Sequence, residues 1–286
     1  MTALLPLAAA WQILTISLAA PIMGSVLLLA IARLTGAGWD VLRVPARWAV
    51  LLPAVALLGI AQLASPPPPH LETWLAWWAV ALRGLVAGGA FAFAASRLLH
   101  GGGETLAGVT LALYAALVTP IASDWMLGQA PGHPVSAVGM MMFVESIGTA
   151  AALPLALGLG DLPFRRDMAK LGVAAALGLA YLAYMDFLIV WFGNVPARVG
   201  FYLERGTPAM SLLASGALLV GLAAPIASLS LVGGERGQRI AGVTLLAGAV
   251  LFNIWWVAGG LLGSLLGLAL VAAVAVLAQR RAVAHG

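Results

Sequence analysis

The sequence contains no cysteine and very little charge. Without cysteine, the chain cannot form disulfides, ligate an iron–sulfur cluster through thiolates or use a thiol nucleophile. Only 8% of its 286 residues are Asp, Glu, Lys or Arg, which is too few to cover the surface of a water-soluble domain of this length. Hydrophobic residues make up 63% of the chain. The composition therefore predicts an integral membrane protein that crosses the bilayer several times.

Motifs for catalysis and cofactor binding are also missing. There is no glycine-rich phosphate loop, no HExxH and no pair of histidines at helical spacing. All four histidines lie in predicted loops or at the terminus (His70, His100, His133 and His285), which argues against bis-histidine haem ligation inside the membrane. The HGGGE at 100–104 resembles an oxyanion-hole motif. Because no G-x-S-x-G nucleophile elbow follows, we interpret it as a helix–helix turn.

What is present is a series of long apolar runs. They predict an all-α polytopic bundle, with residues 1–286 forming a single integral membrane domain. We expect no removable signal peptide, because the first residues lack a basic segment. The last two runs are separated only by the uncharged VAGGLLGS, so one long helix is an alternative to two spans. Forty residues would make a helix of about 60 Å, roughly twice the hydrocarbon thickness, which favours two. The nine predicted spans are 10–32, 46–65, 73–98, 104–123, 134–159, 168–193, 208–231, 239–259 and 261–279.

The basic residues predict the orientation of these spans. The even-numbered loops hold only Arg198 and Arg205, whereas eleven basic residues fall in the odd-numbered loops and the C-terminal tail. The positive-inside rule then places the N-terminus outside and the C-terminus in the cytoplasm. We expect the membrane to be the cytoplasmic (inner) membrane of a bacterium. The net charge of +4 belongs to these short loops and does not indicate nucleic-acid binding. The eleven are Arg33, Arg43, Arg47, Arg97, Arg165, Arg166, Lys170, Arg236, Arg239, Arg280 and Arg281.

Eight of the ten tryptophans fall towards the predicted outer side. The simplest interpretation is an interfacial aromatic belt in contact with lipid head groups. A belt on one side only also suits a surface where another subunit docks. The outer loops are the longest and the richest in proline and glycine, so we expect the functional residues on this side.

Three ionisable residues lie inside predicted spans, which is costly and usually marks a pair or a site. Arg83, Glu145 and Asp186 all fall roughly 12–16 Å below the outer surface, with Asn253 slightly above them. One interpretation is a structural pair of Arg83 with Glu145 or Asp186; the other is a proton path or the head-group site of a quinol. One arginine cannot satisfy both carboxylates, and burial favours the neutral form of the remaining acid. We predict Glu145 as the partner of Arg83 and Asp186 as the acid that handles protons.

Three stretches together resemble one known family. They are ARLTGAGWDVLRVPARWAVLLPAVALL (32–58), SDWMLGQAPGHPVSAVGMMMF (123–143) and YLAYMDFLIVWFGNVPARVGFYLER (181–205). They are similar to the ActF subunit of alternative complex III, a quinol:cytochrome c oxidoreductase, within the NrfD-like integral membrane family. Weaker similarity extends the match to roughly residues 10–260. The chain departs from the family in being short, in carrying Ala197-Arg198 where a Glu pair follows the proline, and in placing Asp186 where glutamine is frequent.

The resemblance implies a helical bundle that binds no cofactor of its own and can interact with quinone or quinol. Its implied partners, besides membrane lipids, are outer-side subunits that carry c-type haem and iron–sulfur clusters and a second, larger NrfD-like integral subunit; a terminal oxidase is a further candidate. Asp124 of the Asp-Trp-Met loop joins the four candidate residues above for the proton path or quinol site. The candidate docking residues are Trp125, Trp191, Asn194, Pro196, Tyr202 and Arg205.

The sequence thus favours an accessory subunit of a respiratory quinol-oxidising complex, which anchors outer-side redox subunits and contributes to quinol binding or proton transfer. Two alternatives stay open. One is a proton-coupled secondary transporter that uses Glu145 and Asp186, although the sequence shows no repeated half. The other is a structural or assembly scaffold.

Overall fold

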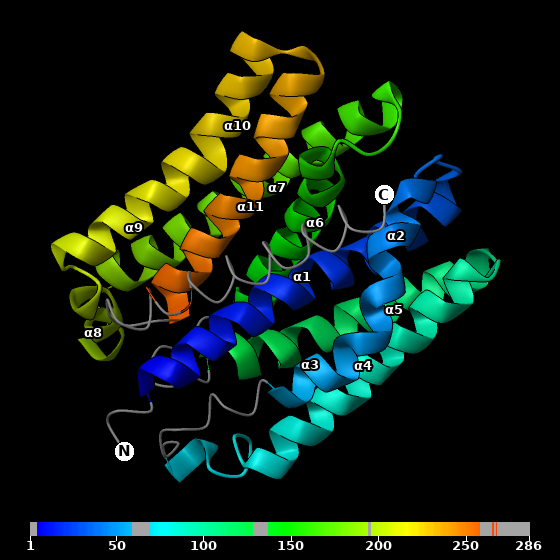
Figure 1. Cartoon of the computed structure of the whole chain (residues 1–286). Coiled ribbons are helices and arrows are strands. Elements are labelled where there is room, and N and C mark those ends of the chain that lie inside the picture. Colours follow the sequence, from blue (N-terminus) through cyan, green and yellow to red (C-terminus); the bar gives the residue numbers. More distant parts are fainter. Residues whose placement is uncertain are drawn as a thin grey trace.

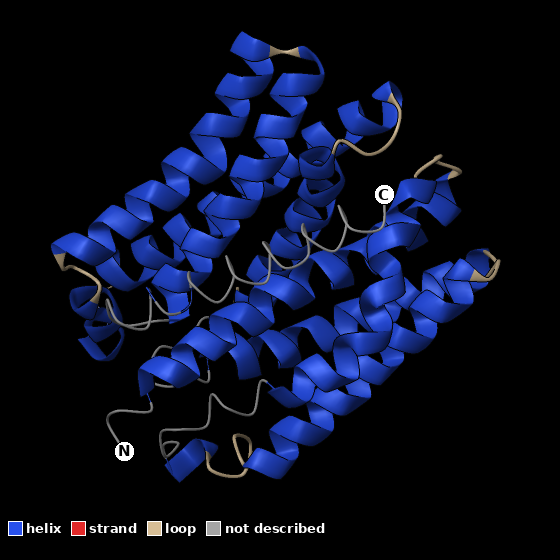
Figure 2. Ribbon diagram, in the orientation of Figure 1, coloured by secondary structure: helices blue, strands red, loops and turns tan. Residues whose placement is uncertain are grey.

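A computed structural model describes residues 5–58, 69–127, 137–193 and 196–257, together with Leu265 and Gly267. Within these ranges the chain is helical and contains no strand (Figure 2), which confirms the all-α prediction. The elements labelled in Figure 1 are α1 (Leu5–Thr35), α2 (Arg43–Ala46), α3 (Leu52–Leu58), α4 (Trp77–Leu99), α5 (Glu104–Ala122), α6 (Val138–Leu157), α7 (Leu162–Phe192), α8 (Pro196–Glu204), α9 (Pro208–Leu218), α10 (Ala224–Ala227) and α11 (Gly234–Val257). Between them lie the 3₁₀ turns η2 (Asp40–Leu42), η3 (Arg47–Leu51) and η5 (Pro69–Leu71) and the π-helical segments η6 (Ser123–Leu127), η7 (Leu219–Ala223) and η8 (Ser228–Val232).

Seven helices in the described ranges are long and apolar enough to cross a membrane. They correspond to the predicted spans 10–32, 73–98, 104–123, 134–159, 168–193, 208–231 and 239–259. The predicted span 46–65 is helical in η3 and α3, but it lies outside the described residues beyond Leu58. Except for Leu265 and Gly267, the predicted span 261–279 also lies outside them. The total of nine therefore stays a prediction.

Polar caps in the sequence fix where two of the long helices begin. The Asp161 carboxylate accepts a hydrogen bond from the Phe164 amide, at 3.0 Å, at the start of α7. The Thr207 hydroxyl accepts one from the Met210 amide, at 3.4 Å, at the start of α9. A proline in the first turn of each helix removes an amide that would otherwise lack a partner.

Within the part of the chain that the structure describes, the long helices pack as two groups of four with similar connections. The first group is α1, α3, α4 and α5, and the second is α6, α7, α9 with its continuation to η8, and α11 (Figure 1). The first helix of each group contacts the last helix of the other, α1 with α11 and α6 with α5, and α1 packs on α6 at the centre. The sequence itself shows no corresponding repeat.

Glycines allow helices to approach closely, both between the two groups and within the second group. A Cβ atom on Gly24 of α1 would lie only 1.9 Å from the Ser146 carbonyl oxygen of α6. In the second group, a Cβ on Gly242 of α11 would lie 2.4 Å from the Ala156 amide nitrogen of α6. Lipid tails are as apolar as the helix surfaces, so helix association in a bilayer depends on such close packing rather than on the hydrophobic effect.

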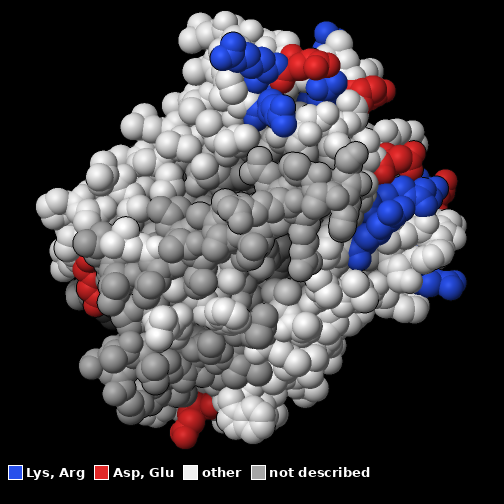
Figure 3. Space-filling model, viewed as in Figure 1, with Lys and Arg blue, Asp and Glu red and all other residues white. Residues whose placement is uncertain are grey.

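The basic loops gather at one end of the bundle, here called the basic end. It carries the connections at 36–39, 100–103, 158–161 and 233, and Lys and Arg side chains cluster there in Figure 3. Three contacts join these connections: the Trp39 indole donates to Asp167, Arg43 donates to the Leu99 carbonyl, and Arg165 pairs with Glu235. The opposite end carries α8 and is called the α8 end. The connections after the first, third, fifth and seventh predicted spans all lie at the basic end, which agrees with the predicted topology. Which side of the membrane each end faces stays a prediction.

We expect a reporter that is active only outside the cytoplasm to be active after Gly206 and silent after Gly102 or Gly234. The physical reason is the excess of Lys and Arg at the basic end, which disfavours its translocation. Fusion activities measured at these three positions in one strain give the answer. The reverse pattern would place the α8 end in the cytoplasm.

Candidate functional site

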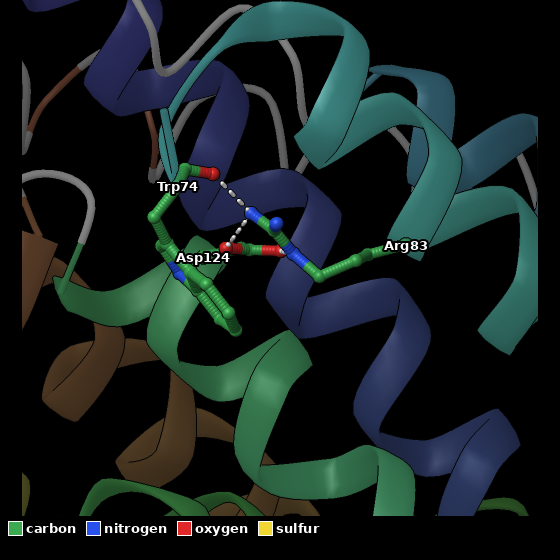
Figure 4. A network of polar contacts seen from close by, with 3 residues as sticks. All are labelled: Trp74, Arg83 and Asp124. Atoms are coloured by element: carbon green, nitrogen blue, oxygen red, sulfur yellow. Dashed lines mark hydrogen bonds and ion pairs between the residues drawn. The ribbon is translucent and has the colours of Figure 1, made fainter. Parts of the chain in front are cut away.

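Arg83 forms a two-point ion pair with Asp124 near the α8 end (Figure 4). Its Nε and Nη2 atoms lie 2.8 and 2.7 Å from the two carboxylate oxygens, and Nη2 also donates to the Trp74 carbonyl at 2.6 Å. The guanidinium lies over the Trp74 ring, 4.1 Å from its centre. Asp124 is buried, so the Arg83 guanidinium balances the charge of a carboxylate that has little contact with solvent.

The prediction that Arg83 pairs with Glu145 is therefore wrong. Arg83 lies on α4, which packs against α3 and α5, whereas Glu145 lies on α6 and turns towards α11. The correct partner had a signal in the sequence. In an antiparallel hairpin that turns at 100–103, position 83 lies opposite roughly position 120, about one helical turn from Asp124.

Glu145 instead pairs with Asn253 between α6 and α11. The Asn253 amide nitrogen donates to Glu145 Oε1 at 2.7 Å, and both side chains are almost fully buried. Among the described residues, neither Glu145 Oε2 nor Asn253 Oδ1 has a hydrogen-bond partner. Glu145 thus keeps one buried oxygen available for a ligand, water or proton.

Asp186 on α7 is held by a residue of α8. The Tyr202 hydroxyl donates to Asp186 Oδ2 at 2.5 Å, which fixes α8 against the end of α7. The Tyr202 ring also contacts Phe187 edge-on, at 5.3 Å between centres. Burial and the hydrogen bond to Asp186 both raise the pKa of Tyr202 above its usual range, so the phenol stays protonated as the donor.

Arg205, just after α8, binds the end of α11. Its guanidinium donates to the carbonyls of Trp255 at 3.0 Å, Trp256 at 2.7 Å and Phe201 at 3.2 Å, and it lies 3.5 Å from the centre of the Phe201 ring. The last carbonyls of a helix are electron-rich and favour a cation. Burial lowers the pKa of Arg205 to about 10, so it remains charged at neutral pH. No carboxylate of the described residues pairs with it.

These groups border one cavity of about 1090 Å³ inside the second helix group. Its walls come from α6, α7, α9, η7 and α11, and the segment from Tyr202 to Gly206 closes its α8 end. Glu145, Tyr202 and Arg205 supply its main polar groups, and most of the remaining lining is apolar. Asn253 and Asp186 lie behind this lining, as the partners of Glu145 and Tyr202. Arg83 and Asp124 are not among the lining residues, so the structure divides the five predicted candidates between two places.

The predicted docking residues differ in how exposed they are. Trp191 and Pro196 are exposed at the α8 end, as docking requires. Trp125 and Arg205 are buried within this chain, so the docking prediction does not fit them. Tyr202 faces the cavity and holds Asp186, and Asn194 lies outside the described residues.

Sequence reasoning missed the wall of the cavity on α7. Among larger side chains it includes small residues at helical spacing, Gly172, Ala175, Ala176, Ala180 and Ala183. The Gly/Ala-rich run GVAAALGLAYLA at 172–183 was the available signal. Small residues in a membrane helix usually mark a helix–helix contact, and only the packed structure shows that part of this face borders a space.

No group of three or more His, Asp or Glu side chains in the described ranges is placed to hold a metal ion. The polar groups of the cavity suit an organic ligand that combines hydrogen-bonding atoms with a large apolar part. Comparison of the chain with protein-family models gives no match. Comparison with curated proteins gives none either.

Proposed function

We propose that the chain is an accessory integral subunit of a quinol-oxidising electron-transfer complex and that its cavity binds the quinol. One observation carries the proposal: a large apolar cavity contains a buried carboxyl group with one oxygen not engaged by the described residues. Ligand sites are typically apolar spaces of this size with a few convergent polar groups.

The dimensions and chemistry of the cavity suit a ring with hydroxyl groups and a long apolar tail. Its wall on α7 extends from Gly172 to Trp191, which is about 28 Å along a helix axis. Tyr202 near the end of α8 and Arg205 just after it place hydrogen-bonding groups at the α8 end of this length. The part near Gly172 and Leu245 is apolar and suits the tail.

Oxidation of a quinol releases two electrons and two protons. The electrons would pass to the redox centres of partner subunits, because the resemblance gives this chain none. Glu145 is the residue that we assign to accept a proton, since its Oε2 is buried beside the cavity and Asn253 fixes its other oxygen. A carboxyl group positioned in this way can act as a general base.

The α8 end would also serve as the docking surface for outer-side redox subunits. We expect Trp191→Ala to reduce co-purification of partner subunits at least several-fold, because exposed tryptophans are frequent energetic centres of interfaces. The matched control is Trp48→Ala, since Trp48 has a similar exposed fraction, 58% against 54%, and lies near the basic end. Unchanged partner recovery for Trp191→Ala, with both variants equally stable, would contradict a docking role for this residue.

A secondary transporter is the second candidate, and one observation favours it: the two similarly arranged helix groups resemble the internal repeats of transporters. The position of the cavity favours the first candidate, because transporter sites lie between repeats and this cavity lies within one group.

Purification of the whole protein in mild detergent separates the proposals. A respiratory subunit should co-purify with haem c absorbance and iron–sulfur electron paramagnetic resonance signals. A transporter should purify without redox partners and catalyse proton-linked uptake in vesicles. A scaffold should show neither uptake nor quinone binding.

A further inference from the structure

We infer that the space between α7 and α9 is a lateral entrance from the bilayer, and that a track of small residues inside it holds the hydrocarbon tail of the ligand. This inference rests on the proposed function for the identity of the head group as a quinol. The entrance and the track rest on the packing alone.

The entrance follows from how α7 and α9 are held. Helix α7 packs against α6 and α11, and α9 packs against α11, while cavity-lining residues of α7 and α9 face one another across a space. Lining residues on both rims are largely exposed, including Tyr181 and Tyr184 on α7 and Leu218 at the end of α9. In a bilayer these exposed apolar and aromatic surfaces contact lipid, so a hydrophobic ligand can reach the cavity without crossing water.

Small side chains form a strip on each of the facing walls. Ala176, Ala180 and Ala183 repeat at helical spacing along α7, and Ala214 and Ala217 face them from α9. Ordinary Leu or Phe side chains at these positions would fill the space. These five alanines leave width for a flexible chain and present only methyl groups to it, and the hydroxyl-bearing Tyr181, Tyr184 and Ser211 also line the cavity.

The first helix group shows that such a space is not a general result of this packing. There, Gly84 and Gly88 of α4 let α3 approach so closely that a Cβ on Gly88 would lie 2.7 Å from the Pro53 nitrogen. The remaining space beside these residues is only about 10 Å³. The first group is closed by glycine contacts, and the second group holds a cavity about a hundred times larger.

Arg205 indicates what the head group must offer. A guanidinium has five N–H donors, and Arg205 uses three of them on backbone carbonyls. Within the described ranges, one N–H on Nη1 and one on Nη2 have no acceptor. A ligand oxygen at the α8 end of the cavity would accept them, which places the head group near Arg205 and Tyr202 and directs the tail along the α7–α9 track.

The test compares two benzoquinones that share one ring, with a decyl tail or a ten-isoprene tail. Their affinities for the purified protein are measured from quenching of tryptophan fluorescence, since Trp191 and Trp255 line the cavity. We expect Ala180→Phe to weaken binding of the long-tailed quinone about tenfold or more and that of the decyl quinone less than twofold. The matched control is Ala174→Phe, because Ala174 is exposed on the same helix and does not line the cavity.

A second pair of variants guards against misfolding of the first. Ala214→Phe fills the opposite wall, and its control is Ser215→Phe on an exposed position that does not line the cavity. The same selective loss in Ala180→Phe and Ala214→Phe supports the track. Equal losses for both tails, or no loss for either, would overturn it.

A separate arm distinguishes failure of the track from failure of the proposed function. The protein is placed in bilayers of phosphatidylcholine with brominated acyl chains, because bromine quenches tryptophan fluorescence. The contribution of Trp255 is obtained in each background as the difference in quenching with and without the substitution Trp255→Phe. Lower Trp255 quenching in Ala180→Phe than in Ala174→Phe, without any quinone binding, would support the track and reject the quinol. Quinone binding that is insensitive to tail length would reject the track and keep the quinol.

Discussion

Replacing Arg83 with alanine should reduce the folded yield severely and lower the free energy of unfolding by about 3–5 kcal/mol. The change leaves the carboxylate of Asp124 buried without its two charge-assisted hydrogen bonds and also frees the Trp74 carbonyl. Breaking one side of a buried pair costs more than the pair contributes, because the remaining charge is uncompensated. Monodisperse yield and thermal unfolding in detergent measure the effect.

Two further variants test the physical reason. The double variant Arg83→Gln with Asp124→Asn removes both charges and keeps two side chains that can hydrogen-bond, so it should recover most of the lost stability. The matched control is Asp40→Asn, which removes the acid of an exposed pair with Arg43 and should change stability by about 1 kcal/mol or less. A double variant as unstable as Arg83→Ala would show that charge matching is not what the pair supplies.

Glu145→Gln should give a complex of normal yield whose quinol oxidation is about a hundredfold slower, the lower range for loss of a general base. The amide keeps the shape of the side chain, and its oxygen can still accept the hydrogen bond from Asn253. It cannot take a proton from a bound quinol. Turnover per assembled complex and complex yield are measured in the same preparations.

Asp186→Asn is the contrasting variant, since the sequence alone had favoured Asp186 as the proton acceptor. In the structure, Asp186 accepts the Tyr202 hydroxyl and lies behind the cavity lining, and an asparagine oxygen can accept the same hydrogen bond. We therefore expect Asp186→Asn to retain most of the turnover. Normal turnover in Glu145→Gln together with a large loss in Asp186→Asn would reverse the assignment and restore the original prediction.

The sequence identified most of the polar residues of the candidate site, but it did not predict which of them contact one another. Arg83, Glu145, Asp186 and Asn253 were chosen because polar groups inside apolar spans are costly. Asp124 was chosen because its loop resembles that of a known family. Their partners were not predictable by depth alone, because similar depth does not tell which faces of which helices meet. The cavity was missed for a related reason: alanine and glycine on α7 are equally compatible with a tight helix contact and with a space.

The sequence by itself determined that this is an all-helical chain with apolar spans, alternating basic loops and a few buried polar groups. These properties are local, because each span depends on its own run of apolar residues and each loop on its own charges. Only the tertiary structure decided that Arg83 meets Asp124, that Glu145 meets Asn253, and that one helix group is closed while the other holds a cavity. Those outcomes depend on helix rotation and on contacts such as that of Gly88 with α3, which involve residues far apart in the chain.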